Sequence, residues 1–107
     1  LPLIISIAKA GWEPITWAFS DKKEIYVERY GRASEGNLHF TVFNDSDKRE
    51  SFRLTIDLPS LGVKGKIRIR EMISGKNVPF SLRNGKAEVD GELDPEDVWL
   101  LKVDLLR

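Results

Sequence analysis

The sequence predicts a mainly β fold: an antiparallel β-sandwich of about seven strands, of Greek-key type, preceded by one short N-terminal helix. Short runs of alternating apolar and polar residues recur at a spacing of roughly 8–12 residues. Turn-forming residues (Asn, Asp, Ser, Gly and Pro) separate these runs. The 107-residue length, with 41% hydrophobic and 32% charged residues, suits one globular domain with its own core. Cysteine is absent, so no disulfide framework is needed or available.

The clearest alternation lies in residues 36–58, where two runs flank the polar stretch 44–49. The residues on one face of the two runs are Leu38, Phe40, Val42, Phe52, Leu54, Ile56 and Leu58. The polar stretch contains Asn, Asp and Ser, which favour turns. We therefore expect the two runs to form an antiparallel hairpin with one solvent-facing side.

The remaining strands are expected at residues 24–30, 64–72, 78–82, 86–93 and 97–105. The dipeptide Asn84-Gly85 predicts a two-residue turn between two of them. The last strand is apolar on both faces at its start, so we expect a central position for it and a core position for Trp99.

Residues 1–11 predict the helix, with Pro2 in its first turn and Gly11 at its end. It is apolar nearly all round and too short to span a bilayer, so it needs cover from other protein. The chain begins without methionine, and we expect it to continue from a longer polypeptide; a trimmed or processed terminus is the alternative. The residues expected to dock on such a neighbour, or to form a homodimer, are Leu3, Ile4, Ile5 and Ile7.

Residues that carry catalytic chemistry are scarce. His39 is the single histidine and falls on the outward face of a predicted strand, which favours a surface role over a catalytic triad. With no cysteine, a zinc site is not expected, and we predict no cofactor. The acidic residues between Asp90 and Asp97 form the best carboxylate cluster, but a solvated strand face explains them better. We expect Glu88, Asp90 and Glu92 to lie opposite Lys66, Arg68 and Arg70 across a sheet.

Aromatic residues are the best candidates for a binding surface. Trp12, Trp17, Tyr26 and Tyr30 are candidates for a carbohydrate platform, because a flat ring offers an apolar face and a polar tip. Packing of Trp12 and Trp17 against the sandwich is the alternative and the more common fate of large aromatics.

The overall charge excludes some partners. Seventeen basic and seventeen acidic residues give a formal net charge of zero, which argues against nucleic acid or a membrane surface as the main partner. The compartment stays open, whether cytoplasmic or secreted. The absence of glutamine, one methionine and many charged residues favour a thermophilic source.

Three stretches carry a family resemblance: residues 10–16 (Ala-Gly-Trp-Glu-Pro-Ile-Thr), residues 26–31 (Tyr-Val-Glu-Arg-Tyr-Gly) and residues 38–44 (Leu-His-Phe-Thr-Val-Phe-Asn). With the closing run 98–103 after an acidic Pro turn, they resemble the C-terminal β-sandwich that follows the (β/α)8 catalytic barrel of glycoside hydrolases. The resemblance implies that residues 1–18 are the end of the barrel and residues 19–107 the sandwich. It also implies that the catalytic carboxylates belong to the barrel and not to this chain.

Three function classes follow. The first is a non-catalytic accessory domain that stabilises the preceding catalytic domain of the same polypeptide. The second is a carbohydrate-binding module that uses exposed aromatic rings, and the third is an immunoglobulin-like protein-interaction domain. The first predicts an apolar docking patch, and the second predicts two or three coplanar exposed rings on one face.

Overall fold

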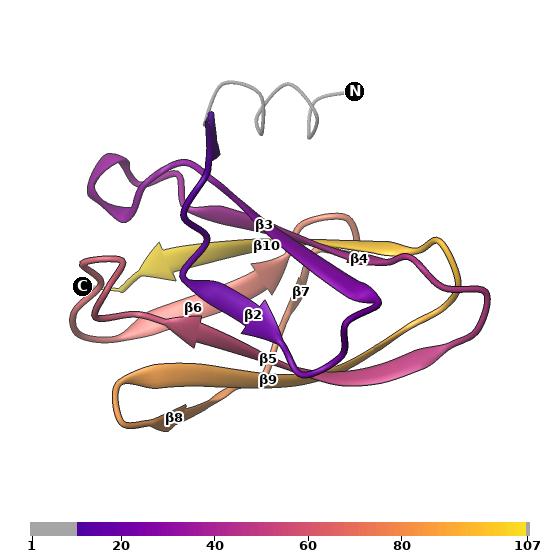
Figure 1. The fold of residues 1–107 in the computed structure, drawn as a ribbon. Coiled ribbons are helices and arrows are strands. Elements are labelled where there is room, and N and C mark those ends of the chain that lie inside the picture. The colour runs from indigo at the N-terminus through magenta and orange to yellow at the C-terminus, as the bar shows by residue number, and fades with distance from the viewer. Residues whose placement is uncertain (1–10, 107) are drawn as a thin grey trace.

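The computed structural model describes residues 11–106, which form ten strands in two antiparallel sheets packed face to face (Figure 1). Sheet A contains, in spatial order, β1 (Trp12–Glu13), β3 (Ile25–Tyr30), β4 (His39–Asn44), β10 (Val98–Leu105), β6 (Ile67–Glu71) and β7 (Lys76–Asn77). Sheet B contains β2 (Ala18–Ser20), β5 (Glu50–Asp57), β9 (Lys86–Leu93) and β8 (Ser81–Arg83). One 3-10 turn, η1 (Ala33–Glu35), interrupts the strands.

The predicted mainly β, antiparallel architecture is confirmed, but the expected count of about seven strands is too low. Four strands, β1, β2, β7 and β8, have only two or three residues, too few to show an alternation in the sequence. Residues 11–18, which lie between the predicted helix and the first predicted strand, contribute β1 and the start of β2. The predicted N-terminal helix falls on residues 1–10, outside the described residues. So do the expected docking residues Leu3, Ile4, Ile5 and Ile7.

The predicted hairpin between residues 36 and 58 is wrong. Strand β4 pairs with β3 and β10 in sheet A, whereas β5 pairs with β2 and β9 in sheet B. The two apolar faces meet across the interior instead of lying side by side, and the polar stretch 45–49 carries the chain from one sheet to the other. Alternation identifies the inward face of a strand, but the same alternation fits either arrangement.

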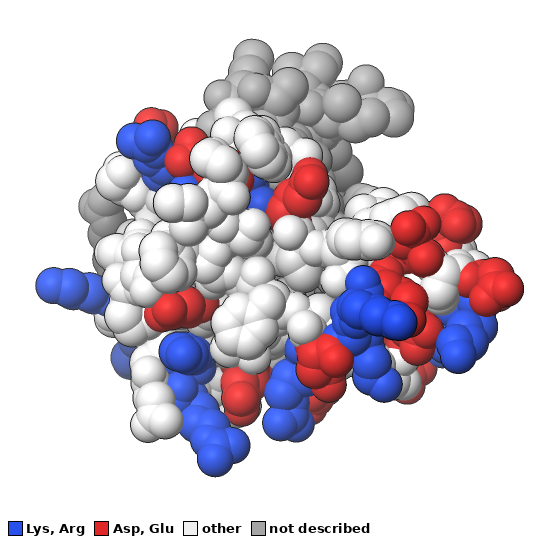
Figure 2. All heavy atoms as spheres, viewed as in Figure 1, with Lys and Arg blue, Asp and Glu red and all other residues white. Residues whose placement is uncertain are grey.

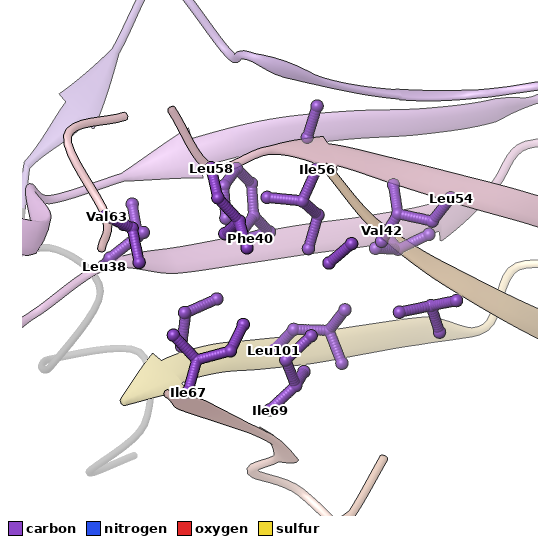
Figure 3. Close-up of a cluster of buried hydrophobic side chains, with 14 of the residues drawn as sticks. Leu38, Phe40, Val42, Leu54, Ile56, Leu58, Val63, Ile67, Ile69 and Leu101 are labelled. Carbon is purple, nitrogen blue, oxygen red and sulfur yellow. The ribbon is translucent and has the colours of Figure 1, made fainter. Parts of the chain in front are cut away.

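The core lies between the two sheets, as the close-up in Figure 3 shows. Each sheet supplies residues from the inward faces that the alternation predicts. The fully or almost fully buried members include Leu38, Phe40, Val42, Leu54, Ile56, Ile69, Val89 and Leu101. Strand β10 lies between β4 and β6 in the middle of sheet A, which confirms its predicted central position.

Two local predictions hold. Asn84 and Gly85 both adopt positive φ, 54° and 78°, and join β8 to β9 with Arg83 opposite Lys86. Trp99 is half-buried and packs against the core, with its ring edge-to-face with Phe52 at a centroid distance of 5.4 Å. The opposing residue on β9 is Gly91, where an added Cβ would lie 2.3 Å from Cη2 of Trp99. Only glycine leaves room for this ring.

Two buried polar side chains fasten loops to the sandwich. Asn44, at the end of β4, donates from Nδ2 to the carbonyls of Lys48, Leu93 and Asp94 at 2.9, 2.9 and 3.2 Å. Glu71, at the end of β6, accepts hydrogen bonds from the backbone N–H groups of Ile73, Ser74 and Leu100 at 3.1, 2.7 and 3.0 Å.

Candidate functional site

The four aromatic residues predicted as a platform do not all lie together. Trp12 and Tyr30 are directly opposed on β1 and β3, so their side chains share the outer face of sheet A. Tyr26 lies on the same face, four residues before Tyr30 and therefore about 13 Å along the strand. Trp17 lies on the connection from β1 to β2, where its carbonyl accepts a hydrogen bond from Asp57 N–H at the edge of sheet B. Trp12, Tyr30 and Tyr26 thus share one face of sheet A, with Glu28 between the two tyrosines, and Trp17 stands apart.

On this face of sheet A, the Tyr30 hydroxyl acts as a hydrogen-bond donor. It donates to Glu28 Oε2 at 3.2 Å. Burial, with the hydrogen bond and the charge of Glu28, raises the pKa of Tyr30, so the phenol keeps the proton that it donates to Glu28.

The segment that contains Trp12 and Trp17 is rich in exposed apolar side chains. Four large ones are between 43% and 58% exposed, and we call them the β1–β2 edge: Trp12, Ile15, Trp17 and Phe19. The space-filling view shows a largely uncharged surface over β2 and the chain leading to it, with the charged side chains gathered elsewhere (Figure 2). The sequence prediction included the two tryptophans of this edge and missed Ile15 and Phe19.

An ion-pair clasp fixes the start of this edge. Glu13 accepts from Arg29 at 2.9 Å and lies 3.5 Å from Arg32, so one carboxylate holds two guanidinium groups. Nε of Arg29 is buried without a hydrogen-bond partner in the described chain. A small cavity of about 400 Å³ adjoins these three side chains. The clasp holds β1 against β3 and so keeps Trp12 in place beside Tyr30.

The prediction that His39 is a surface residue is wrong, because the side chain is only 4% exposed. It does lie on the outer face of sheet A, between Tyr30 on β3 and Lys102 on β10. Its Nδ1 donates to the Asn37 carbonyl at 2.6 Å. Burial lowers the pKa of His39, and the charge of Lys102 adds to this, against opposing effects of Asn37 and Asp104. Among the described residues, the ring's one side-chain hydrogen bond is to the backbone carbonyl of Asn37, and no serine hydroxyl or carboxylate bonds to it as triad chemistry requires.

The acidic cluster is bound up in ion pairs, but its partners differ from the predicted ones. Asp90 pairs with Arg53 on the neighbouring strand β5, and Glu92 pairs with Arg49. Arg68 and Arg70 pair instead with Asp104 on β10 in sheet A. The predicted opposition of Glu88, Asp90 and Glu92 to Lys66, Arg68 and Arg70 is therefore wrong, because the two groups belong to different sheets.

The acidic residues do not build a metal site either. In the described part of the chain, no group of three or more His, Asp or Glu side chains is placed to hold a metal ion. The hydrogen bond to Arg53 lowers the pKa of Asp90, and the one to Arg49 lowers the pKa of Glu92. Both carboxylates are consequently held ionised, which suits ion pairing and not proton transfer at neutral pH.

A second, larger cavity is a cleft of about 1100 Å³, which we call the seam cleft. One side is β9 at residues 90–92 in sheet B, and the other is the chain that leaves β7 at residues 76–79. Trp99 and Phe52 line it from the interior. None of the four predicted platform residues lines this cleft. Gly91, a glycine that interrupts an otherwise apolar inward face, was the sequence signal for a close approach at this point.

Comparison with known proteins adds no function. No protein family matches the chain, and no curated protein matches it either. Within residues 11–106, no helix has the length and hydrophobicity needed to cross a bilayer.

Proposed function

We propose that this chain is a non-catalytic accessory β-sandwich that docks on the catalytic domain of a glycoside hydrolase, as the resemblance of its sequence implies. The observation that carries the proposal is the β1–β2 edge. Four large apolar side chains are exposed within eight residues, between 43% and 58% each. Exposed apolar surface of this density is typical of a contact with other protein.

The electrostatics of the described surface agree with a supporting role. The acidic side chains of Asp90, Glu92 and Asp104 are each tied to arginine. The clasp of Glu13 with Arg29 and Arg32 would give the docking strand a fixed position before the partner arrives. A preformed surface loses less conformational entropy on docking than one that must first become ordered.

The test is amide hydrogen exchange on residues 11–106, measured in the chain alone and in the whole polypeptide that its gene encodes. We expect the amides of residues 12–19 to become protected in the whole polypeptide, while the β9 amides keep the same exchange rate. Replacement of Phe19 by Ser should reduce that protection, and replacement of the exposed Leu82, far from this edge, should not. Equal exchange of residues 12–19 in both forms would contradict docking and leave an interaction domain of another kind.

A carbohydrate-binding module is the second candidate, and the presence of Trp12, Tyr30 and Tyr26 on one face of sheet A favours it. Calorimetric titration with a panel of oligosaccharides, with tryptophan fluorescence alongside, tests this candidate. Binding that is lost on Trp12→Ala and kept on Trp17→Ala would support it, because only Trp12 shares a face with the two tyrosines. No heat and no fluorescence change across the panel would exclude it.

A further inference from the structure

Strand β9 is paired along its whole length on one side only. On that side β5 matches all eight residues, from Glu50 opposite Leu93 to Asp57 opposite Lys86. On the other side β8 matches three residues, Lys86 to Glu88. The stretch from Val89 to Leu93 therefore forms an edge of sheet B, and this edge is one wall of the seam cleft.

The orientation of the main chain decides which groups this edge offers. In a two-residue hairpin the residues that flank the turn, here Arg83 and Lys86, exchange both main-chain hydrogen bonds. The same orientation recurs at every second residue, so Asp90 and Glu92 direct their N–H and C=O groups away from β5. Among the described residues, none forms a backbone hydrogen bond with these groups of Asp90 and Glu92.

Pro79 explains why the pairing stops. Continuing the register of Ser81 with Glu88 would place Pro79 opposite Asp90. Proline has no N–H to donate to the Asp90 carbonyl. The chain turns away instead, and the N–H of Val78 donates to the Ile69 carbonyl in sheet A at 2.8 Å. The departure of this segment opens the cleft between the edges of the two sheets.

Charge does not close this edge. Charged side chains on an edge strand usually discourage pairing with another chain. Here Asp90 and Glu92 are each neutralised by an arginine, with N–O distances of 2.8 Å to Arg53 and 2.7 Å to Arg49. Their side chains lie on the outer face of sheet B, out of the path of a strand added beside β9.

We propose that the free edge of β9 in the seam cleft binds an extended peptide segment of a partner polypeptide, which adds to sheet B as a strand. The unpaired groups of Asp90 and Glu92 would form its main-chain hydrogen bonds, as in other strand-addition complexes. A peptide residue opposite Gly91 would direct its side chain inward, where Trp99 and Val78 line the cleft. An apolar residue is therefore favoured at that position, and the adjacent positions face solvent. This site is independent of the β1–β2 edge.

The probe is the capped peptide acetyl-Lys-Thr-Val-Thr-Val-Lys-amide, titrated into the 15N-labelled chain. We expect saturable shifts at the Asp90 and Glu92 amides and at the Trp99 indole. The matched control is the same peptide with its two threonine nitrogens methylated. In an antiparallel addition with a valine opposite Gly91, the threonines lie opposite Asp90 and Glu92, and their N–H groups are the ones that donate to the edge. The affinity of the methylated peptide should be weaker by roughly tenfold, the effect of losing one or two hydrogen bonds.

Variants give a second control. Asp90→Pro removes the edge N–H without breaking a bond to β5 and should weaken binding by roughly tenfold. Asp90→Ala loses the same ion pair with Arg53 but keeps the N–H, so its affinity should match that of the wild type. If Asp90→Pro fails to fold, the methylated peptide still decides.

Three results of the titration would overturn the proposal. They are no saturable shift at millimolar peptide, equal affinity for the methylated peptide, and shifts confined to β1 or β2. A dimer that is detected by sedimentation and joined through the β9 edges of its two copies would also overturn it. The segment beside β9 would then belong to a second copy of this chain.

Discussion

Asn44 and Glu71 solve the same structural problem with opposite chemistry. Each is buried at the end of a strand of sheet A, and each bonds to three backbone groups. The backbone around Asn44 presents carbonyl oxygens, and its Nδ2 donates to three of them. The backbone around Glu71 presents N–H groups instead, and the two carboxylate oxygens of Glu71 accept hydrogen bonds from three of them.

The comparison teaches that the type of backbone group at a buried site, donor or acceptor, determines which polar side chain suits that site. An unpaired main-chain group inside a protein carries a large desolvation cost, so it selects a partner of the opposite hydrogen-bonding type. Asn44 even tolerates a buried Oδ1 without a partner in the described chain, whereas both oxygens of Glu71 are used. Exchanging the donor or the acceptor at either site should therefore be costly, although the substituted side chains are nearly equal in shape.

The largest effect is expected for Asn44→Asp. At neutral pH this change places a carboxylate against three carbonyl oxygens and removes their donor. An uncompensated buried charge of this kind costs about 3–5 kcal/mol of unfolding free energy. Urea denaturation measures the loss, and Asn77→Asp, at an exposed position, adds the same negative charge as a control. A loss below about 1 kcal/mol would mean that the loop carbonyls can find water instead.

Glu71→Gln should cost less, because one acceptor oxygen remains. If that oxygen keeps Ile73 and Leu100, the new NH2 group faces the N–H of Ser74, which loses its partner. We expect a loss of about 1–3 kcal/mol in the same urea experiment. Stability equal to the wild type would contradict the view that the carboxylate is needed for its second oxygen.

Acid should separate the two sites, because only Glu71 titrates. Burial alone would raise the pKa of Glu71, but the N–H donors from Leu100, Ser74 and Ile73 outweigh it and the pKa is lowered from 4.5. The stabilisation by Glu71 is therefore complete above pH 4.5 and is lost as the pH falls through the folded pKa. We expect the stability gap between wild type and Glu71→Gln to be constant near neutrality and to shrink below pH 4.5.

Other carboxylates do not disturb this measurement. The pKa values of Asp90, Glu92 and Asp104 are also lowered, so both proteins lose stability in acid for those reasons as well. These contributions cancel in the difference between wild type and variant. A gap that stays constant down to the acid transition would show that Glu71 carries no net preference for its charged form.

What the sequence predicted correctly was local. Alternation identified the inward residues of the long strands, such as Leu54 and Ile56, and Asn84-Gly85 identified a turn whose positive φ angles only a few residues tolerate. The pairing of β4 depended on β10, more than fifty residues away in the chain, and no local pattern encodes which strands become neighbours. The same limit misplaced the partners of Arg68 and Asp90.

The candidate site was harder to predict for the same reason. Trp99 was placed correctly because apolar neighbours surround it in the sequence itself. His39 was misplaced because its cover includes Tyr30 and Lys102, which only sheet pairing brings to its sides. The seam cleft joins segments that are far apart in the chain, among them those around residues 77, 91 and 99, and Gly91 and Pro79 were the two available signals. Asn44 and Glu71 gave none, since a polar residue at a strand end reads as a turn.

The smallest effects sharpen the comparison most, since they separate main-chain from side-chain contributions. Lys48 is exposed and meets Asn44 only through its carbonyl, and Ser74 meets the Glu71 carboxylate through its N–H at 2.7 Å. Alanine at either position keeps the main-chain group. We therefore expect Lys48→Ala and Ser74→Ala to change the unfolding free energy by no more than about 0.5 kcal/mol.

The Ser74 hydroxyl provides the stricter half of this test. Its Oγ lies 3.4 Å from the Glu71 carbonyl and 3.4 Å from the Lys76 nitrogen, both at the limit of a hydrogen bond. A loss above about 1 kcal/mol for Ser74→Ala would assign the turn to the hydroxyl instead of the carboxylate. Together, the losses of unfolding free energy for Ser74→Ala and Glu71→Gln decide which group holds the end of β6 to β10.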